Sequence, residues 1–134
     1  MAYANREKLA QLFAAEVEKF QAAHRESEKL YRVAKQHMMS GVPMSWMAKW
    51  PGGFPVYVQH AKGSRFTDVD DIEYVDFCLG DTGAMVGHSP DASLAAIKAQ
   101  LDKGITFMLP TDSASSAAGI LAERFGISKW QFTL

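Results

Sequence analysis

The sequence predicts a mixed α/β chain with an N-terminal helix, a three-stranded antiparallel meander, two further helices and a final strand. Three observations support this fold class. Apolar residues recur every three or four positions near the N-terminus, three short strand-like runs lie between residues 54 and 78, and two later helical patterns each end at a glycine. We expect segment boundaries near residues 38 and 104, which give ranges 1–38, 39–104 and 105–134.

Size and composition limit the classes of function. The chain has 134 residues, of which 48% are hydrophobic and 22% charged, so it is globular and at most one ordinary domain. The formal net charge is −1. This balance supports neither a nucleic-acid partner nor a membrane surface. Cys78 is the single cysteine, which excludes an intrachain disulfide and indicates a reducing, cytoplasmic setting.

The first helix is expected over residues 5–38, with Asn5 as its N-cap. Its apolar stripe comprises Leu9, Leu12, Phe13, Val17 and Phe20. The stripe thins after Ala22 and resumes at Leu30, so we expect a kink or break near His24.

Residues 39–53 carry turn signals and large apolar side chains, which must pack on this chain or on a partner. Strands are expected over residues 54–60, 65–69 and 74–78. The acidic pair Asp70–Asp71 between the last two predicts a tight hairpin turn, since Asp tolerates a positive φ.

Two helices are expected in the second half. Ser89 and Pro90 suit the N-cap and first position of a helix that buries Leu94, Ile97 and Leu101 and closes at Gly104. Thr111 is expected to cap a helix that runs to Phe125 and closes at Gly126. Residues 130–134 read as a strand, which must pair with another strand.

Several motifs fail on their chemistry. The run Asp68-x-Asp70-Asp71 lacks the later glycine and glutamate of a calcium loop. The four histidines have no spacing suited to a metal site, and the neighbours His88, Ser89 and Asp91 cannot form a hydrolase triad. His88 is better explained by a structural hydrogen bond than by catalysis.

The run Asp81-Thr82-Gly83 is shared with aspartic proteases, whose chemistry needs a second carboxylate. A homodimer could supply that carboxylate, but the helix-rich surroundings argue against an all-β protease.

Four segments taken in order resemble class III aminotransferases, the fold-type I enzymes that use pyridoxal 5'-phosphate (PLP). The likeness is to the branch of glutamate-1-semialdehyde aminomutase and β-amino-acid aminotransferases. The segments are Phe54–Gly63, the hairpin Phe66–Phe77, the helix start Gly87-His88-Ser89-Pro90, and the loop Ile105–Thr111. The likeness runs from about Lys29 to Leu134.

The resemblance implies the N-terminal portion of an enzyme that transfers an amino group between an amine or amino acid and a keto acid, or shifts it within one molecule. Residues 39–104 would belong to the small domain, and residues 105–134 would begin the PLP-binding large domain. The partners implied are the remainder of the enzyme, a second copy in a homodimer, and small amine and keto-acid substrates. None of the nine lysines matches the family's catalytic lysine, so the residues that anchor PLP are expected outside this chain.

The resemblance also implies three substrate-binding segments, whose candidate residues are Ser45, Trp46, Asp81, Thr82, Phe107 and Met108. Some relatives place an arginine near Ser45 to bind the substrate carboxylate, and a hydroxyl cannot replace that bidentate contact. Asp81 would favour a cationic or hydroxyl-bearing substrate group. Each of these residues also has a structural explanation: packing for Trp46, burial of a dimer interface for Phe107 and Met108, and a turn for Asp81. A non-catalytic α+β module that binds or assembles with a partner remains the alternative.

Overall fold

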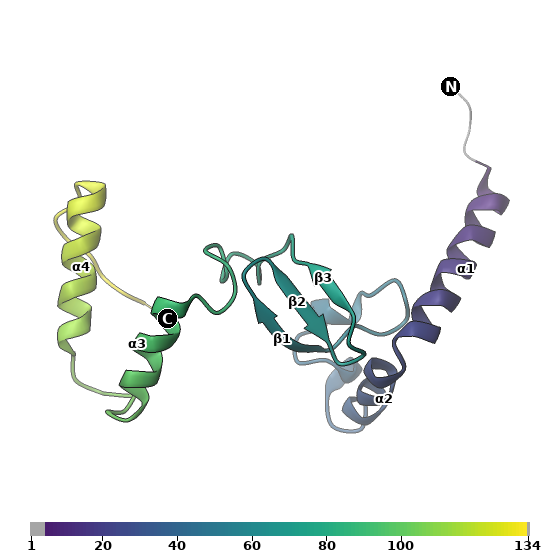
Figure 1. Ribbon diagram of the computed structural model, residues 1–134, viewed down its shortest axis with the longest axis horizontal. Helices are drawn as coiled ribbons and strands as arrows, with labels where there is room; N and C mark the ends of the chain where they lie inside the picture. The colour runs from purple at the N-terminus through teal and green to yellow at the C-terminus, as the bar shows by residue number, and fades with distance from the viewer. Residues whose placement is uncertain (1–4, 134) are drawn as a thin grey trace. The chain divides into compact units, whose positions relative to one another are not determined.

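A computed structural model describes residues 5–133 (Figure 1). The α-helices are α1 (Arg6–Ala23), α2 (Arg25–Ala34), α3 (Asp91–Leu101) and α4 (Asp112–Phe125). Two short 3-10 helices, η1 (Met39–Gly41) and η2 (Ser45–Ala48), precede the strands β1 (Val58–Lys62), β2 (Arg65–Asp68) and β3 (Glu73–Val75). The chain divides into two compact units, with the boundary in the sequence between Asp91 and Ala92.

The break expected near His24 is confirmed. Helix α1 begins after Asn5, whose side-chain oxygen accepts a hydrogen bond from the Lys8 amide at 3.0 Å. His24 then takes the non-helical angles φ −116° and ψ 53°, although its amide still bonds the Phe20 carbonyl. The predicted single helix is therefore two helices that share His24 as their junction.

The antiparallel meander is also confirmed, with the strand order β1-β2-β3. Asp71 has a φ of +61° in the turn between β2 and β3, as the hairpin prediction requires. The first strand begins at Val58 and not at residue 54. Pro55 has no amide hydrogen for a ladder, and Phe54 is instead buried in the core.

The core of the first unit is a small aromatic cluster between the helices and the segment before β1. Phe54 is only 4% exposed, and its ring centroid lies 5.1 Å from that of Phe20 and 6.4 Å from that of Tyr31. Gly52 is buried beneath Phe20, and a β-carbon there would overlap the Phe20 ring. The cluster therefore fixes α1 and α2 against the chain that leads into the sheet.

The caps of the later helices were predicted with mixed success. Gly126 closes α4 with a φ of +69°, as expected, and Thr111 has the extended backbone of an N-cap, but its side chain makes no capping hydrogen bond. The prediction that Ser89 caps α3 is wrong, because α3 begins at Asp91 and Ser89 has a φ of +50°. That left-handed conformation differs from the extended one that an N-cap adopts.

The second unit lacks the buried stripe that the sequence predicts. No residue of α3 or α4 is buried, and Ile97 and Leu101 are both more than half exposed. Residues 130–133 form no strand, because a strand needs a hydrogen-bonded neighbour and none of residues 5–133 pairs with them. Leu134 lies outside the described residues.

Candidate functional site

The loop of residues 77–87 follows β3 and carries two of the predicted substrate residues, Asp81 and Thr82. It is built from successive turns, with hydrogen bonds from the Asp81 amide to the Cys78 carbonyl and from the Ala84 amide to the Leu79 carbonyl. Leu79, Asp81 and Thr82 all have φ between +52° and +76°. Asp81 and Thr82 are exposed, so their side chains are free to meet a ligand or another protein surface.

Asp76 organises the start of this loop. One carboxylate oxygen, Oδ1, accepts hydrogen bonds from the amides of Cys78 and Leu79 at 2.8 and 2.9 Å. The other, Oδ2, lies 2.6 Å from Nε2 of His88. The hydrogen bond with His88 and those from the two amides lower the pKa of Asp76. The carboxylate is therefore charged at neutral pH, and His88 has the structural hydrogen bond that the sequence predicted.

Ser45 and Trp46 lie on η2, in the irregular segment before the strands. Trp46 is 62% exposed and lines an apolar cavity of about 370 Å³. The cavity is lined by Val42, Pro43, Trp46, Met47, Trp50, Pro55, Val56, Tyr57, Val58 and Phe66. The large apolar residues of this segment therefore pack partly on their own chain, as predicted, while Trp46 keeps a free face.

Phe107 and Met108 belong to the second unit, in the loop between α3 and α4. Phe107 lies against Gly104, and the Gly104 carbonyl accepts a hydrogen bond from the Gln100 side chain at 2.7 Å. Met108 is fully exposed. This loop thus turns an apolar tip to solvent, and its backbone is held by contacts close in sequence.

The six predicted substrate residues are therefore three pairs of sequence neighbours, which lie on three separate segments. In the first unit, no hydrogen bond among residues 5–91 joins Ser45 or Trp46 to Asp81 or Thr82. Their assignment as substrate-binding residues stays a prediction.

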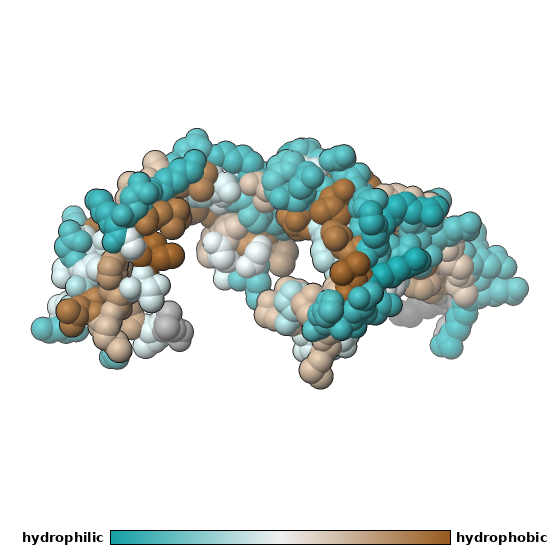
Figure 2. Space-filling view, turned by 90° about the horizontal axis from the view of Figure 1, so that it is seen from below, coloured by the Kyte–Doolittle hydropathy of each residue, from teal (hydrophilic) through white to brown (hydrophobic). Residues whose placement is uncertain are grey.

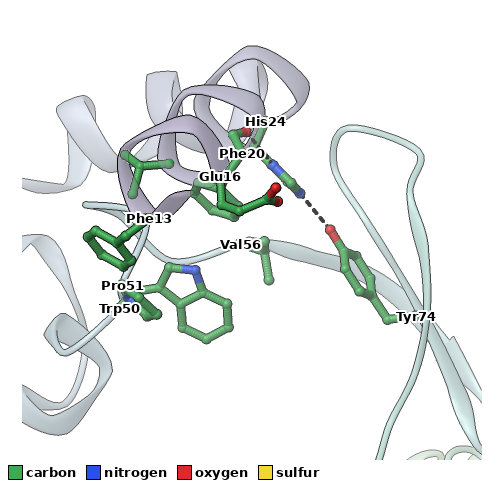
Figure 3. A pocket seen from close by; sticks show the side chains of 10 residues that line it. Phe13, Glu16, Phe20, His24, Trp50, Pro51, Val56 and Tyr74 are labelled. Atoms are coloured by element: carbon green, nitrogen blue, oxygen red, sulfur yellow. Dashed lines mark hydrogen bonds between the residues drawn. The ribbon is translucent and has the colours of Figure 1, made fainter. Parts of the chain in front are cut away.

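Sequence reasoning missed a polar network at the junction of α1 and α2 (Figure 3). Nε2 of His24 lies 2.5 Å from the Tyr74 hydroxyl, which donates to Oδ2 of Asp68 at 2.9 Å. Nδ1 of His24 lies 2.6 Å from the Phe20 carbonyl. The two imidazole nitrogens of His24 thus join α1 to β3, one through the Phe20 carbonyl and the other through the Tyr74 hydroxyl.

Asp68 is the most buried member of this network, with no exposed surface. Its Oδ1 accepts hydrogen bonds from the amides of Asp70 and Ile72, both at 2.9 Å. Burial, followed by the hydrogen bond with Asp68, raises the pKa of Tyr74, so the hydroxyl stays protonated. The carboxylate ties the β2–β3 turn to the helix junction.

Asp70 caps α2 from a distance. Its carboxylate accepts hydrogen bonds from the amides of Glu26 and Ser27 and from the Ser27 hydroxyl, at 2.7, 3.0 and 2.7 Å. Burial would raise the pKa of Asp70, but these hydrogen bonds outweigh it and lower the pKa. The only signal in the sequence was the acidic turn, because the capped helix lies more than 40 residues earlier.

A cleft of about 310 Å³ adjoins this network, between α1 and the segment before β1. Figure 3 shows Phe13 and Glu16 on one side and Trp50 and Val56 on the other, with the His24–Tyr74 contact at one end. Within residues 5–133, no helix is long and apolar enough to cross a membrane, and no three metal-ligating side chains gather.

No protein-family model matches the chain. Curated relatives do match it. The glutamate-1-semialdehyde 2,1-aminomutase of Psychrobacter sp. (strain PRwf-1) is 37% identical over 100 residues, which are 72% of this chain and 23% of the relative. That of Methanosarcina acetivorans is 40% identical over 86 residues, or 64% of this chain and 20% of the relative. The chain spans about a quarter of the length of the curated relatives it matches.

Solved structures agree. A glutamate-1-semialdehyde aminomutase from Pseudomonas aeruginosa PAO1 matches 95% of this chain and 28% of its own, with a TM-score of 0.87 and 42% identity. A β-phenylalanine aminotransferase from Variovorax paradoxus matches 87% of this chain and 27% of its own, with a TM-score of 0.78. At 23% identity, the second likeness concerns the fold alone.

The fold is thus that of a part of the class III, fold-type I PLP-dependent aminotransferases. Within that class, the chain is homologous to glutamate-1-semialdehyde aminomutases over most of its length.

Proposed function

We propose that this chain is part of a PLP-dependent enzyme that transfers an amino group between an amine or amino acid and a keto acid, or shifts it within one substrate as an aminomutase does. The observation that carries the proposal is the 42% identity and TM-score of 0.87 with the Pseudomonas aeruginosa aminomutase over 95% of the chain. A variant of that aminomutase was solved in complex with PMP, and a 33% identical transaminase with PLP bound.

The residues of this chain do not fit PLP by themselves. PLP enzymes hold the cofactor through a lysine Schiff base, and the cofactor supplies an electron sink for the amino-group chemistry. No lysine lines any of the three cavities described for residues 5–133. We therefore assign this chain the substrate-facing and interface loops, and assign the cofactor's lysine to the rest of the enzyme.

Exposed apolar side chains support burial against other protein. Only Ala34, Val42 and Phe54 are buried hydrophobic residues among those described. Figure 2 shows hydrophobic residues lying open on the face that it presents. The exposed large apolar residues include Phe77, Met85, Val86, Ile105, Met108 and Leu109. Such surfaces are typical of interfaces, and we propose the remainder of the enzyme and a second copy in a cytoplasmic homodimer as their partners.

A chimera tests the function. The matching segment of the Pseudomonas aeruginosa aminomutase is replaced by this chain, which gives an enzyme that we term the reconstituted enzyme. We expect a purified homodimer that shows the absorbance of bound PLP and either shifts the amino group within glutamate 1-semialdehyde or transfers an amino group from one of a panel of amines to a keto acid. A dimer that binds PLP and transfers no amino group would contradict the proposal. A monomeric chain that binds a different partner would favour the non-catalytic module.

Asp81 offers a test of the substrate loop. In the reconstituted enzyme, Asp81→Asn removes a charge from an exposed side chain without changing its size. We expect the preference for cationic or hydroxyl-bearing amines over neutral ones to fall about tenfold, since one charged contact is worth roughly 1.5–3 kcal/mol. The measurement is kcat/KM across amine donors, with the exposed residue Asp102 changed to Asn as control. An unchanged preference would remove Asp81 from the site.

A further inference from the structure

The base of the loop of residues 77–87 is closed by one side-chain contact and one main-chain bridge. Nε2 of His88 lies 2.6 Å from Oδ2 of Asp76, and both side chains are largely buried. Beside this contact, Gly63 and His88 exchange two backbone hydrogen bonds of 3.0 and 2.8 Å. His88 therefore joins the end of the loop both to its start and to the turn between β1 and β2.

At this base, the main chain of Gly87 packs closely against that of Gly63. Gly87 has a φ of +91°, and a β-carbon on it would lie 3.2 Å from Cα of Gly63. Just beyond the loop, the Lys62 ammonium donates to the Ser89 carbonyl at 2.7 Å. The two ends of the loop are thus fixed against the first strand pair.

Between these fixed ends, the loop holds a strained backbone. Leu79, Asp81 and Thr82 occupy the left-handed region, in which the β-carbon of an L-residue crowds the following carbonyl oxygen. Thr82 is β-branched, so its φ of +76° is especially unfavourable. Strained residues of this kind persist only where surrounding contacts over-determine them, and they gather at functional sites.

We propose that His88 is a positioning residue, which acts through Asp76 to hold the loop of residues 77–87 in the strained form that presents Asp81 and Thr82 to the substrate. This inference rests on the proposed function. His88 does not contact the substrate in this role. Its hydrogen bond with Asp76 keeps the Asp76 carboxylate aimed at the amides of Cys78 and Leu79, where the left-handed run begins.

The kinetic test uses the reconstituted enzyme with His88→Ala, His88→Gln and Asp76→Asn. We expect His88→Ala to raise KM for the amine substrate about tenfold with little change in kcat, because a misplaced loop weakens substrate binding. His88→Gln keeps an N–H donor for Asp76 and should restore KM to within about threefold of the parent. The control is His60→Ala, which changes an exposed histidine on β1 and should leave KM unchanged.

A local measurement separates positioning from general stability. Hydrogen exchange on the full 134-residue chain should show faster exchange of the Leu79 and Ala84 amides in His88→Ala, by about tenfold, with α1 unchanged. If His88→Ala does not fold, Asp76→Asn provides the same comparison, and the same loop-specific increase is expected.

The outcomes are distinct. An inactive parent enzyme would defeat the proposed function, whereas the exchange measurement would still decide whether His88 fixes the loop. An active parent in which neither KM nor loop exchange responds to His88→Ala would overturn the present inference. A lower melting temperature with unchanged KM would assign His88 to stability alone and would also overturn it.

Discussion

The two units of the chain differ in the contacts that hold each of them together internally. In the first unit, residues far apart in sequence are joined by buried or partly buried polar contacts: His24 to Tyr74, Asp70 to α2, and Asp76 to His88. In residues 92–133, the side-chain hydrogen bonds link groups only three or four positions apart, such as Gln100 with Gly104 and Trp130 with Ile127. The first unit is therefore held by contacts between distant segments, whereas α3 and α4 of the second unit contain no buried residue.

The substitution expected to change the free energy of unfolding most is the removal of the Asp68 carboxylate. Its carboxylate is fully buried and is bonded by the Tyr74 hydroxyl and by the amides of Asp70 and Ile72. Asp68→Ala leaves the Tyr74 hydroxyl and the two amides without their acceptor. We expect a loss of about 3–5 kcal/mol in the free energy of unfolding.

Urea unfolding of the full chain, followed by tryptophan fluorescence, measures this loss. Asp102→Ala is the matched control, because Asp102 is an exposed aspartate of the second unit. Equal effects of the two substitutions would refute the idea that a buried network dominates the first unit.

Overpacking beneath Phe20 should have the next largest effect. Gly52→Ala places a methyl group where the Phe20 ring lies, so the ring or the segment before β1 must move. We expect a destabilisation of about 1–3 kcal/mol, measured by the same urea unfolding. Gly119→Ala is the control, since a β-carbon at Gly119 meets nothing within 4 Å and alanine favours a helix. A neutral Gly52→Ala would mean that the aromatic cluster is loosely packed.

Substitution of Asp70 should lower the free energy of unfolding by a smaller amount, and this loss should depend on pH. Because its pKa is lowered in the folded chain, its stabilisation is fully present above the unfolded value of about 3.9 and is lost as pH falls through the lower folded value. Asp70→Asn should cost about 1 kcal/mol at pH 7, in the range of helix caps. Solvent screening reduces any larger figure, since Asp70 is partly exposed.

The measurement is urea unfolding at pH 7 and at a series of lower pH values, along which the difference between parent and Asp70→Asn should shrink as Asp70 becomes protonated. The neighbour Asp71 provides the control, because asparagine tolerates the positive φ of Asp71 and that side chain does not cap α2. A cost that stays constant with pH would show that the charge of Asp70 is not what stabilises α2.

The parts that sequence could predict are those decided by neighbouring residues. The break at His24, the Asp70–Asp71 turn, the start of α4 after Thr111 and its end at Gly126 follow from short-range propensity. Ser89 has the residue type of an N-cap, but the backbone bridge between Gly63 and His88 fixes the preceding chain and the helix starts later. Local propensity was overridden there by a tertiary contact.

The polar network escaped sequence reasoning for a physical reason. Asp68 and Asp70 look like an ordinary acidic turn, and their partners at the α1–α2 junction and in α2 lie more than 40 residues away. The residue type alone predicts that an aspartate is exposed, because isolated carboxylates favour water. The burial of Asp68 could therefore not be predicted from the sequence. The unformed strand at residues 130–133 has the opposite cause: its pattern is strand-like, but pairing needs a neighbour that residues 5–133 do not provide.

The smallest expected effect on the free energy of unfolding is that of a substitution at Met108, in the loop between α3 and α4. This substitution also tests whether the second unit relies on a partner more than the first unit does. Met108 is fully exposed, so Met108→Ser should change the free energy of unfolding of the 134-residue chain by less than about 0.5 kcal/mol. If this tip is a main contact of the dimer in the reconstituted enzyme, the same substitution should weaken the dimer about tenfold, because the few residues that dominate an interface each cost more than about 1 kcal/mol when truncated. Met39→Ser, which changes an exposed methionine of the first unit, is the comparison. Analytical ultracentrifugation measures the dimer dissociation, and a dimer weakened equally by both substitutions would show that the second unit has no special dependence on a partner.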